Sequence, residues 1–297
     1  DYAGKIKAGE SKAMAIAWTD SSAVALNTYK YVRIGEEEPN YLTFTAQEAK
    51  STISLKWKSA DQNSVYISKN DGTTWDSYTA GKTITLTNVG DKVSFKGKNV
   101  TTDFSNHFTM SGKIAASGSV TSLTDGKGND SNVQLQKECY KYMFYNCTVL
   151  TAAPELPATN LKDNCYNYMF CNCTSLTTAP KLPAISLVEY CYEGMFSGCV
   201  GLTTAPVLLA QAVPNAAYQK MFESCTSLTA APALLAETIG GGSYGNMFAG
   251  CTSLTTPPST LPAKSLASGC YSGMFSGCTS LKTVPTILAV NLADRCF

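Results

Sequence analysis

Cysteine and histidine have the greatest capacity for chemistry in this sequence, because thiolates and imidazoles act as nucleophiles, bases and metal ligands. The chain of 297 residues contains twelve cysteines but a single histidine, His107. No Cys-x-x-Cys pair occurs, so the pattern does not favour zinc. A Cys-His or Ser-His-Asp mechanism would have to recruit His107 from an expected strand, where a structural histidine is the more common case. The sequence therefore predicts a protein that is not an enzyme and that carries no metal or cofactor.

The cysteines follow a repeat. Cys139, Cys165 and Cys191 begin near-copies 26 residues apart, with the template C-Y-x-x-M-F-x-x-C-x-x-L-x-x-x-P. The frame continues at Ala217, Ser243, Cys270 and Cys296, which gives six repeats and the start of a seventh. Position nine is always cysteine: Cys147, Cys173, Cys199, Cys225, Cys251 and Cys278. The invariant Met-Phe pairs are the expected structural core: Met143, Phe144, Met169, Phe170, Met195, Phe196, Met221, Phe222, Met247, Phe248, Met274 and Phe275.

The template predicts a short helix followed by a short strand in every repeat. Positions one, two, five, six and nine lie along one stripe of a helix, and the leucine at position twelve opens a threonine-rich extended piece. Neither piece buries its apolar face alone, so neighbouring repeats must stack. Within a helix, cysteines at positions one and nine lie about 12 Å apart, too far for a disulfide. We therefore expect an α/β leucine-rich-repeat solenoid with buried free thiols. Cys171, at position seven, is the expected partly exposed exception.

The chain before the repeats has a different pattern. Alternating apolar and polar residues predict strands, and a sandwich-like all-β domain, over 41–45, 52–57, 64–68, 83–87 and 92–96. The expected organisation is an N-terminal β segment over 1–39, with possible strands at 13–17 and 29–34, a β-sandwich-like domain over 40–123, a linker over 124–134 and the solenoid over 135–297. The linker contains several acidic and amide side chains over 125–132, which leaves flexible linker and Ca²⁺ site as alternatives.

The segment Phe-x-x-Cys-x-x-Leu, as in Phe196 to Leu202 or Phe275 to Leu281, resembles the repeat core of BspA-type leucine-rich-repeat surface proteins of bacteria. The resemblance covers about residues 135–297, although this repeat is longer and has Met-Phe where many relatives have Ala-Phe. It implies adhesion or recognition at a bacterial surface and no catalytic residues. A shorter segment, Ser68 to Trp75, looks like the Asp-box hairpin of sialidases and other β-proteins, where it is a structural turn.

The charge and hydrophobicity of the chain exclude some classes of binding partner. The formal net charge is +1 without a block of like charge, so nucleic acid is not an expected partner. No apolar run is long enough for insertion into a membrane. We expect a secreted or cell-surface protein, exported by a signal outside the given sequence, that binds a protein or glycan. The alternative is a spacer without a ligand of its own. The expected binding face comprises the residues at template position thirteen: Thr151, Thr177, Thr203, Thr229, Thr255 and Lys282.

Overall fold

The computed structural model describes residues 14–15, 31–32, 38–58 and 65–297, which fall into two compact units, 1–38 and 39–297. In the first unit, β1 (Met14–Ala15) and β2 (Tyr31–Val32) pair antiparallel. The remainder of the segment expected over 1–39 lies outside the described residues, apart from residues 38 and 39.

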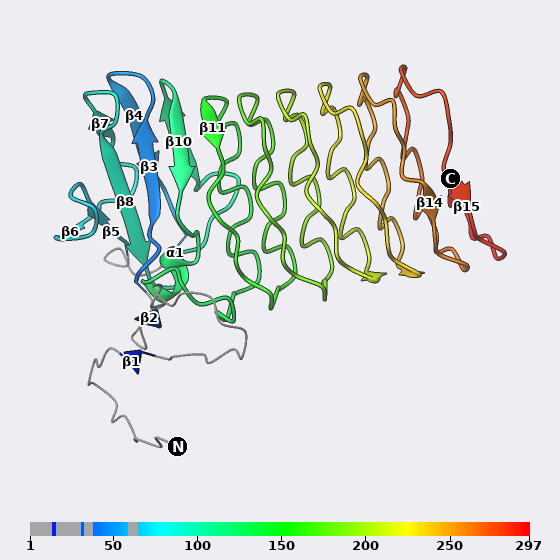
Figure 1. Cartoon of the computed structure of the whole chain (residues 1–297), viewed down its shortest axis with the longest axis horizontal. Coiled ribbons are helices and arrows are strands. Elements are labelled where there is room, and N and C mark those ends of the chain that lie inside the picture. Colours follow the sequence, from blue (N-terminus) through cyan, green and yellow to red (C-terminus); the bar gives the residue numbers. More distant parts are fainter. Residues whose placement is uncertain (1–13, 16–30, 33–37, 59–64) are drawn as a thin grey trace, which may run out of the picture. The chain divides into compact units, whose positions relative to one another are not determined.

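The unit begins with a β-module whose strands overlap the five expected segments (Figure 1). Strand β3 (Leu42–Ala46) alternates buried and half-buried residues, as does β4 (Ser51–Leu55), so one side of each strand faces the core. One sheet has six strands in the order β11-β10-β3-β8-β5-β6, and the other has three in the order β7-β4-β9. The remaining strands of the module are β5 (Val65–Ser68), β6 (Asp76–Ser77), β7 (Ile84–Leu86), β8 (Lys92–Gly97), β9 (Phe108–Ser111) and β10 (Ile114–Ser117).

The β-module and the first repeat share one continuous hydrophobic core. Strand β10 pairs antiparallel with β3 on one side and parallel with β11 (Leu150–Ala152), in the first repeat, on the other. The N–H of Phe108 donates to the carbonyl of Met143 at 2.9 Å, and the Phe108 ring stacks 5.3 Å from that of Phe144. Phe108 thus occupies the place that a preceding repeat would fill with its own phenylalanine.

The segment expected as a linker, 124–134, is tied to both sides of this junction. The only helix in the described residues, α1 (Ser122–Asp125), ends there on Gly126, whose φ of 79° is left-handed. The carbonyl of Lys127 accepts the N–H of Asn40, and the carbonyl of Ser131 accepts the N–H of Thr159. Val133 is buried in the common core.

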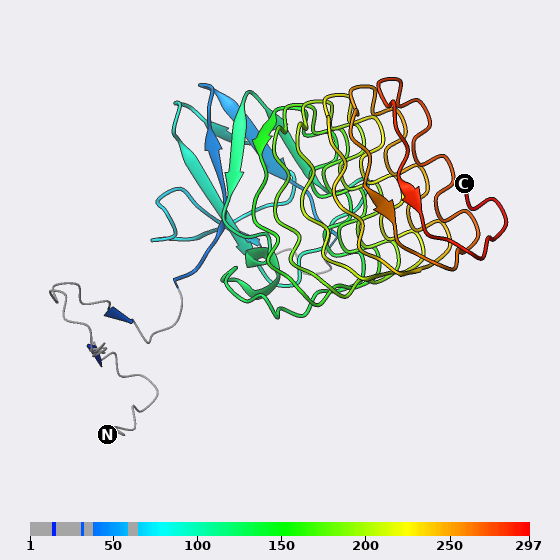
Figure 2. The same ribbon diagram turned by 45° about the vertical axis from the view of Figure 1, so that its right-hand side comes forward.

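The repeats contain no helix, so the expected α/β leucine-rich-repeat architecture, with a helix in each repeat, is wrong. Residues at positions one to nine form consecutive tight turns with a period of four residues. In the first repeat Lys141, Met143 and Tyr145 donate to carbonyls three residues back, as in β-turns. The alternate residues Tyr142 and Phe144 donate instead to carbonyls of the following repeat. Because the rest of each repeat is extended, the described residues are almost entirely β and turn (Figure 2).

The spacing of the apolar residues explains why the sequence predicts a helix in each repeat. Apolar residues at positions one, two, five, six and nine repeat every 4.0 residues, and over two turns this pattern resembles the 3.6-residue period of a helix. The distinguishing signal is the backbone at positions four and eight, which has positive φ in every repeat. A left-handed residue every fourth position is incompatible with an α-helix and favours glycine and asparagine. Position eight is occupied accordingly by Asn146, Asn172, Gly198, Ser224, Gly250 and Gly277.

The other side of each repeat is extended and pairs in parallel with the equivalent residues of its neighbours. Short ladders join β12 (Ala212–Val213) to β13 (Thr238–Ile239), and β14 (Thr260–Leu261) to β15 (Thr286–Ile287). Proline recurs at position sixteen, where it cannot donate a hydrogen bond, so this side has only short strands. The fifth repeat, which starts at Ser243, has 27 residues, and its extra residue falls on this extended side between Pro258 and Leu261.

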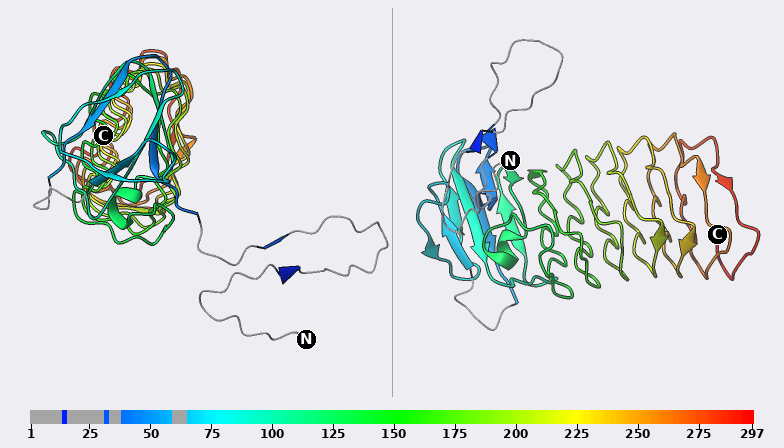
Figure 3. Two further views of the ribbon diagram at one scale, coloured as in Figure 1. Left: turned by 90° about the vertical axis from the view of Figure 1, so that its left-hand side faces the viewer. Right: turned by 60° about the horizontal axis from the view of Figure 1, so that its bottom comes forward.

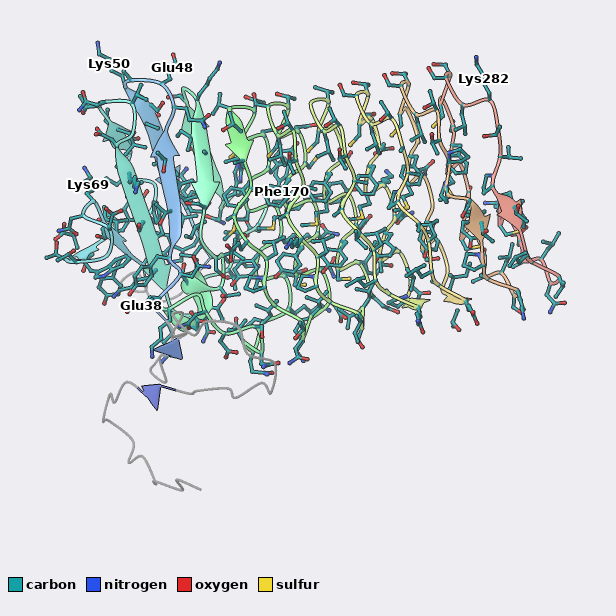
Figure 4. All side chains as sticks on the ribbon, in the orientation of Figure 1. Glu38, Glu48, Lys50, Lys69, Phe170 and Lys282 are labelled. Carbon is teal, nitrogen blue, oxygen red and sulfur yellow. The ribbon has the colours of Figure 1, made fainter. Side chains whose placement is uncertain are left out.

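Stacking of equal turns builds ladders of identical side chains along the axis. Six phenylalanines from Phe144 to Phe275 stack with centroids 5.3 to 5.8 Å apart and nearly parallel planes. A second ladder runs through the position-two tyrosines, from Tyr140 to Tyr271. Figure 4 shows Phe170 inside the stack, close to the sulfur atoms. The views along and across the axis show the turns in near register (Figure 3).

Candidate recognition surface

The cysteine thiols, which are the side-chain groups best suited to chemistry, have a structural role. All twelve cysteines are free and buried. From the second repeat on, each position-nine thiol donates to the carbonyl of the phenylalanine one repeat earlier, as Cys173 does to Phe144 at 3.1 Å, whereas Cys147 of the first repeat donates to Phe108 of the β-module at 3.3 Å. Burial raises the pKa of Cys139 and of Cys191 to about 12, so the nucleophilic thiolate is strongly disfavoured. The cysteine ladders therefore fill the core and provide hydrogen-bond donors for buried backbone carbonyl groups.

Cys171 and His107 lie in surroundings that differ from those predicted from the sequence. Cys171 is only 7% exposed, because it lies between repeats near Ser197 and Glu223, so the expectation of an exposed thiol is wrong. Its burial raises the pKa of the thiol to about 11. His107 is half-buried just before β9, and burial lowers its pKa. Its ring lies 6.0 Å from that of Tyr145, and its Nδ1 atom is buried without a hydrogen-bond partner in the described part of the chain.

The structure brings the position-thirteen residues together as a strip along the extended side, which we call the threonine strip. Thr177, Thr203, Thr229, Thr255 and Lys282 are exposed, whereas Thr151 is half-buried beside the β-module. Several hydroxyls are already engaged: Thr203 donates to the carbonyl of Thr177 at 3.4 Å and Thr255 to that of Thr229 at 3.1 Å. Lys282 ends the strip and points away from the stack (Figure 4). The hydroxyls of the strip are therefore partly committed to the backbone.

A second surface was missed at the sequence level. Most residues at positions three, four and seven of the tight turns reach the surface, apart from the buried residues Asn167, Cys171, Gly194 and Gly245, and they form what we call the turn face. Their chemistry changes from repeat to repeat, whereas the inward Met-Phe pair never changes. The first two repeats place Lys141, Tyr142, Tyr145 and Tyr168 there, the third and fourth place Glu193, Ser197, Gln219, Lys220 and Glu223, and the fifth and sixth place mostly glycine, serine and alanine.

Four aromatic rings cluster at the start of this face, and we call them the aromatic platform: Phe104, Tyr142, Tyr145 and Tyr168. The centroid of Phe104 lies 5.5 Å from that of Tyr142 and 5.1 Å from that of Tyr145. Tyr168 stacks on Tyr142 at 5.5 Å. Phe104 is 58% exposed, which is unusual for a phenylalanine in a well-packed molecule.

The loop that carries Phe104 is held firmly. The carboxylate of Asp103 accepts the N–H groups of Ser105 and Asn106 and the side-chain amide of Asn106, each at 2.9 Å. The neighbouring Thr102 is buried, and its hydroxyl donates to the carbonyl of Lys141 at 2.9 Å. The exposed ring is therefore anchored to the first repeat by a rigid turn.

One signal in the sequence could have indicated this cluster. Position four carries tyrosine in the first two repeats and then Gly194, where a repeat that only needed packing would continue the same residue. A Cβ at Gly194 would lie 2.3 Å from Cε1 of Tyr168, so the glycine makes room for that ring. Phe104 could not have been placed there from the sequence, because it comes from a loop of the β-module.

The other sequence motifs serve as turns. Oδ1 of Asp125 accepts the N–H groups of Lys127 and Gly128, both at 2.7 Å, and no group of metal-binding side chains occurs among the described residues. In the Asp-box-like hairpin, Asn70 accepts the N–H of Thr74, and Nε1 of the tryptophan donates to Gly72. No helix in the described residues is long and apolar enough to cross a membrane.

Comparisons of this chain with protein-family models, with curated proteins and with solved structures find no match.

Proposed function

We propose that this chain is a non-catalytic recognition protein of a cell surface or the extracellular space, and that it binds a protein or glycan through the outer surface of its solenoid. The BspA-type resemblance of the repeats points in the same direction. The buried thiols support a non-catalytic role, because groups with such raised pKa values do not act as nucleophiles near neutral pH.

The observation that carries the proposal is the contrast between a constant interior and a variable exterior. Phe144, Phe170, Phe196, Phe222 and Phe248 are fully buried and identical from repeat to repeat. The outward turn-face positions of the same repeats differ in size, charge and polarity. A rigid repeating scaffold that displays a non-repeating surface is suited to recognition, since binding energy concentrates in a few exposed side chains on a preorganised support.

A spacer without a ligand is the second candidate. It is favoured by the uniform threonine strip and by the small turn-face residues of the last two repeats, such as Gly245, Ala249 and Ser276. These surfaces lack the aromatic and arginine anchors that dominate interface energetics.

Bead adhesion separates the two candidates. Beads displaying the whole chain should adhere to surfaces coated with mucin, which presents both protein and glycan, more strongly than beads without it. Thr203→Glu and Thr229→Glu test the threonine strip, and Lys220→Glu tests the turn face. Each side chain is exposed or half-exposed, so each change should alter stability by less than about 0.5 kcal/mol.

Loss of adhesion in one set of variants, with an unchanged thermal midpoint, would support recognition and identify the face. Equal adhesion by wild type and all three variants would count against both faces and favour the spacer.

A further inference from the structure

We propose that the aromatic platform, together with the amide and carboxylate groups around Glu193, is a binding site for an extended neutral oligosaccharide. This inference rests on the proposed function and specifies one of its two ligand classes. It is carried by the exposure of Phe104, by the half-buried rings of Tyr142, Tyr145 and Tyr168 beside it, and by the polar groups around them.

The platform presents apolar surface that the fold does not require. Phe104 lies outside the common core and remains 58% exposed, although the loop from Thr102 to Asn106 fixes its position with several hydrogen bonds. An apolar ring held rigid in water costs free energy unless a ligand covers it. Rigid aromatic rings provide a large contact area at a low entropic cost.

The rings contact one another at interplanar angles from 16° to 86°, and this close packing excludes an aromatic cage. Phe104, Tyr142 and Tyr145 have centroids 5.1 to 5.5 Å apart and contact one another directly. A quaternary ammonium group has no room between rings at these distances, so cation recognition of the cage type does not fit. A ligand must lie across the platform. Sugar rings suit the exposed ring of Phe104, because their C–H groups carry partial positive charge and aromatic faces carry partial negative charge.

Polar groups next to the rings have the chemistry that sugar hydroxyls need. Glu193 is half-buried beside Tyr142 and Tyr168, and its carboxylate accepts the Asn167 amide at 2.7 Å. At position eight, the Asn172 amide donates to Asn146 Oδ1 at 2.9 Å, so two amide groups of consecutive repeats lie side by side along the axis. Carboxylate and amide groups together donate to and accept from hydroxyls, and a few such groups fix the orientation of a ligand.

The same surroundings argue against a protein partner. Interface hot spots combine aromatic residues with arginine, and the one arginine in the described part of the chain, Arg295, lies in the last turn of the solenoid. The cations near the site are lysines: the Nζ of Lys141 lies 5.8 Å from the Tyr142 ring and 3.7 Å from Glu138. Burial raises the pKa of the Glu193 carboxyl group, and Lys220 lies close enough to oppose this rise.

The direction of the site follows the solenoid axis. Tyr142 and Tyr168 are equivalent residues of consecutive repeats, and their 5.5 Å spacing is close to the length of one sugar unit in an extended β-1,4-linked chain. The stack ends at Gly194, where no side chain continues it. The platform therefore spans only a few sugar units, which predicts weak binding of a single site and a gain on multivalent surfaces.

Calorimetric titration of the whole chain tests the inference with three probes: the hexamers of β-1,4-linked glucose, β-1,4-linked N-acetylglucosamine and α-1,4-linked glucose. At least one hexamer should bind. Phe104→Ala and Glu193→Gln should each weaken binding by about tenfold, the first by removing stacking area and the second by replacing an acceptor. The matched control is Tyr66→Ala, since Tyr66 is a partly exposed aromatic residue on β5, and it should leave affinity unchanged.

Absence of binding by all three hexamers, or unchanged binding by Phe104→Ala, would overturn the inference. The mucin adhesion assay keeps this failure distinct from failure of the proposed function. If no hexamer binds while Phe104→Ala abolishes adhesion, the platform recognises protein, and the glycan assignment is wrong although recognition stands. If adhesion is unaffected by every platform, strip and turn-face variant, the recognition function itself fails.

Discussion

The β-module and the repeats use the same core in opposite ways. In the β-module, aromatic rings meet edge to face, as Phe95 and Phe108 do at an interplanar angle of 89°. In the repeats, Phe170 and Phe196 lie almost parallel, with an interplanar angle of 3°. Edge-to-face contact is available wherever neighbours can be oriented freely. Translation from one repeat to the next removes this freedom, because each side chain must pack on a copy of itself in the same orientation.

This difference explains which residues each region tolerates. A charged side chain at an inner repeat position would face its own copy in both neighbours, and like charges at that distance repel. Small or neutral side chains that can pack on copies of themselves are required. Position one accordingly carries cysteine in most repeats, Ala217 in the fourth and Ser243 in the fifth. The β-module contains no cysteine, because its strands bring unlike residues together. The distribution of thiols is thus a record of translational packing.

The largest test of this contrast is alkaline stability. Burial raises the pKa of Cys139, Cys191 and Cys251 to about 12, whereas an unfolded thiol titrates near 8.5. The stability that these thiols contribute is fully present below about pH 8.5 and is lost as pH rises toward about 12. Each buried thiol should lower the free energy of unfolding by about 1.4 kcal/mol per pH unit in this window. Urea unfolding at pH 8 and pH 10 should differ by several kcal/mol.

The control for this prediction is Cys191→Ala, which copies the residue that the fourth repeat carries at the same position. This substitution should reduce the pH dependence of the free energy of unfolding by the contribution of one thiol. A free energy of unfolding that stays constant between pH 8 and pH 10 would contradict the packing role of the thiol ladders.

The second test compares a middle repeat with the last. Phe196 is fully buried between Phe170 and Phe222, so Phe196→Ala should cost about 3 to 5 kcal/mol of unfolding free energy. Phe275 contacts one phenylalanine of its ladder, Phe248, and is only partly buried, so Phe275→Ala should cost clearly less. Chemical denaturation of the two variants measures the difference. Equal costs would mean that the neighbouring repeats contribute little to the burial of each ring.

The third and smallest test concerns the backbone of the tight turns. Gly198, at position eight, has a φ of 73°, and a Cβ there would lie 2.1 Å from Oδ1 of Asn172. Gly198→Ala should therefore cost about 1 to 3 kcal/mol. Ser224 has the same position and a φ of 60°, so Ser224→Gly should be neutral or slightly stabilising. If Gly198→Ala were neutral in thermal unfolding, left-handed backbone would not be a requirement of these turns.

The sequence reveals the repeat and its inward residues, because translation imposes identity on them. It does not reveal the turn type, since a four-residue period over nine residues is close to that of a helix. The glycine and asparagine at position eight, Gly198 and Asn172 among them, contain the missing information, because they mark left-handed backbone. The aromatic platform could be predicted only in part: the tyrosines break the repeat pattern, whereas Phe104 joins them through tertiary structure.

The extra residue of the fifth repeat has a consequence for how such a chain changes in evolution. Every tight turn donates to its neighbour with a fixed offset, so an inserted residue there would misalign all the following bonds of that turn. On the extended side, one residue between Pro258 and Leu261 is absorbed, and Cys278 still reaches the carbonyl of Phe248 at 3.1 Å. Insertions of a single residue should therefore be tolerated only on the extended side. Duplication or loss of an entire 26-residue repeat leaves the contacts with both neighbouring repeats intact. The gene can thus lengthen or shorten the protein in whole repeats without redesigning its interior.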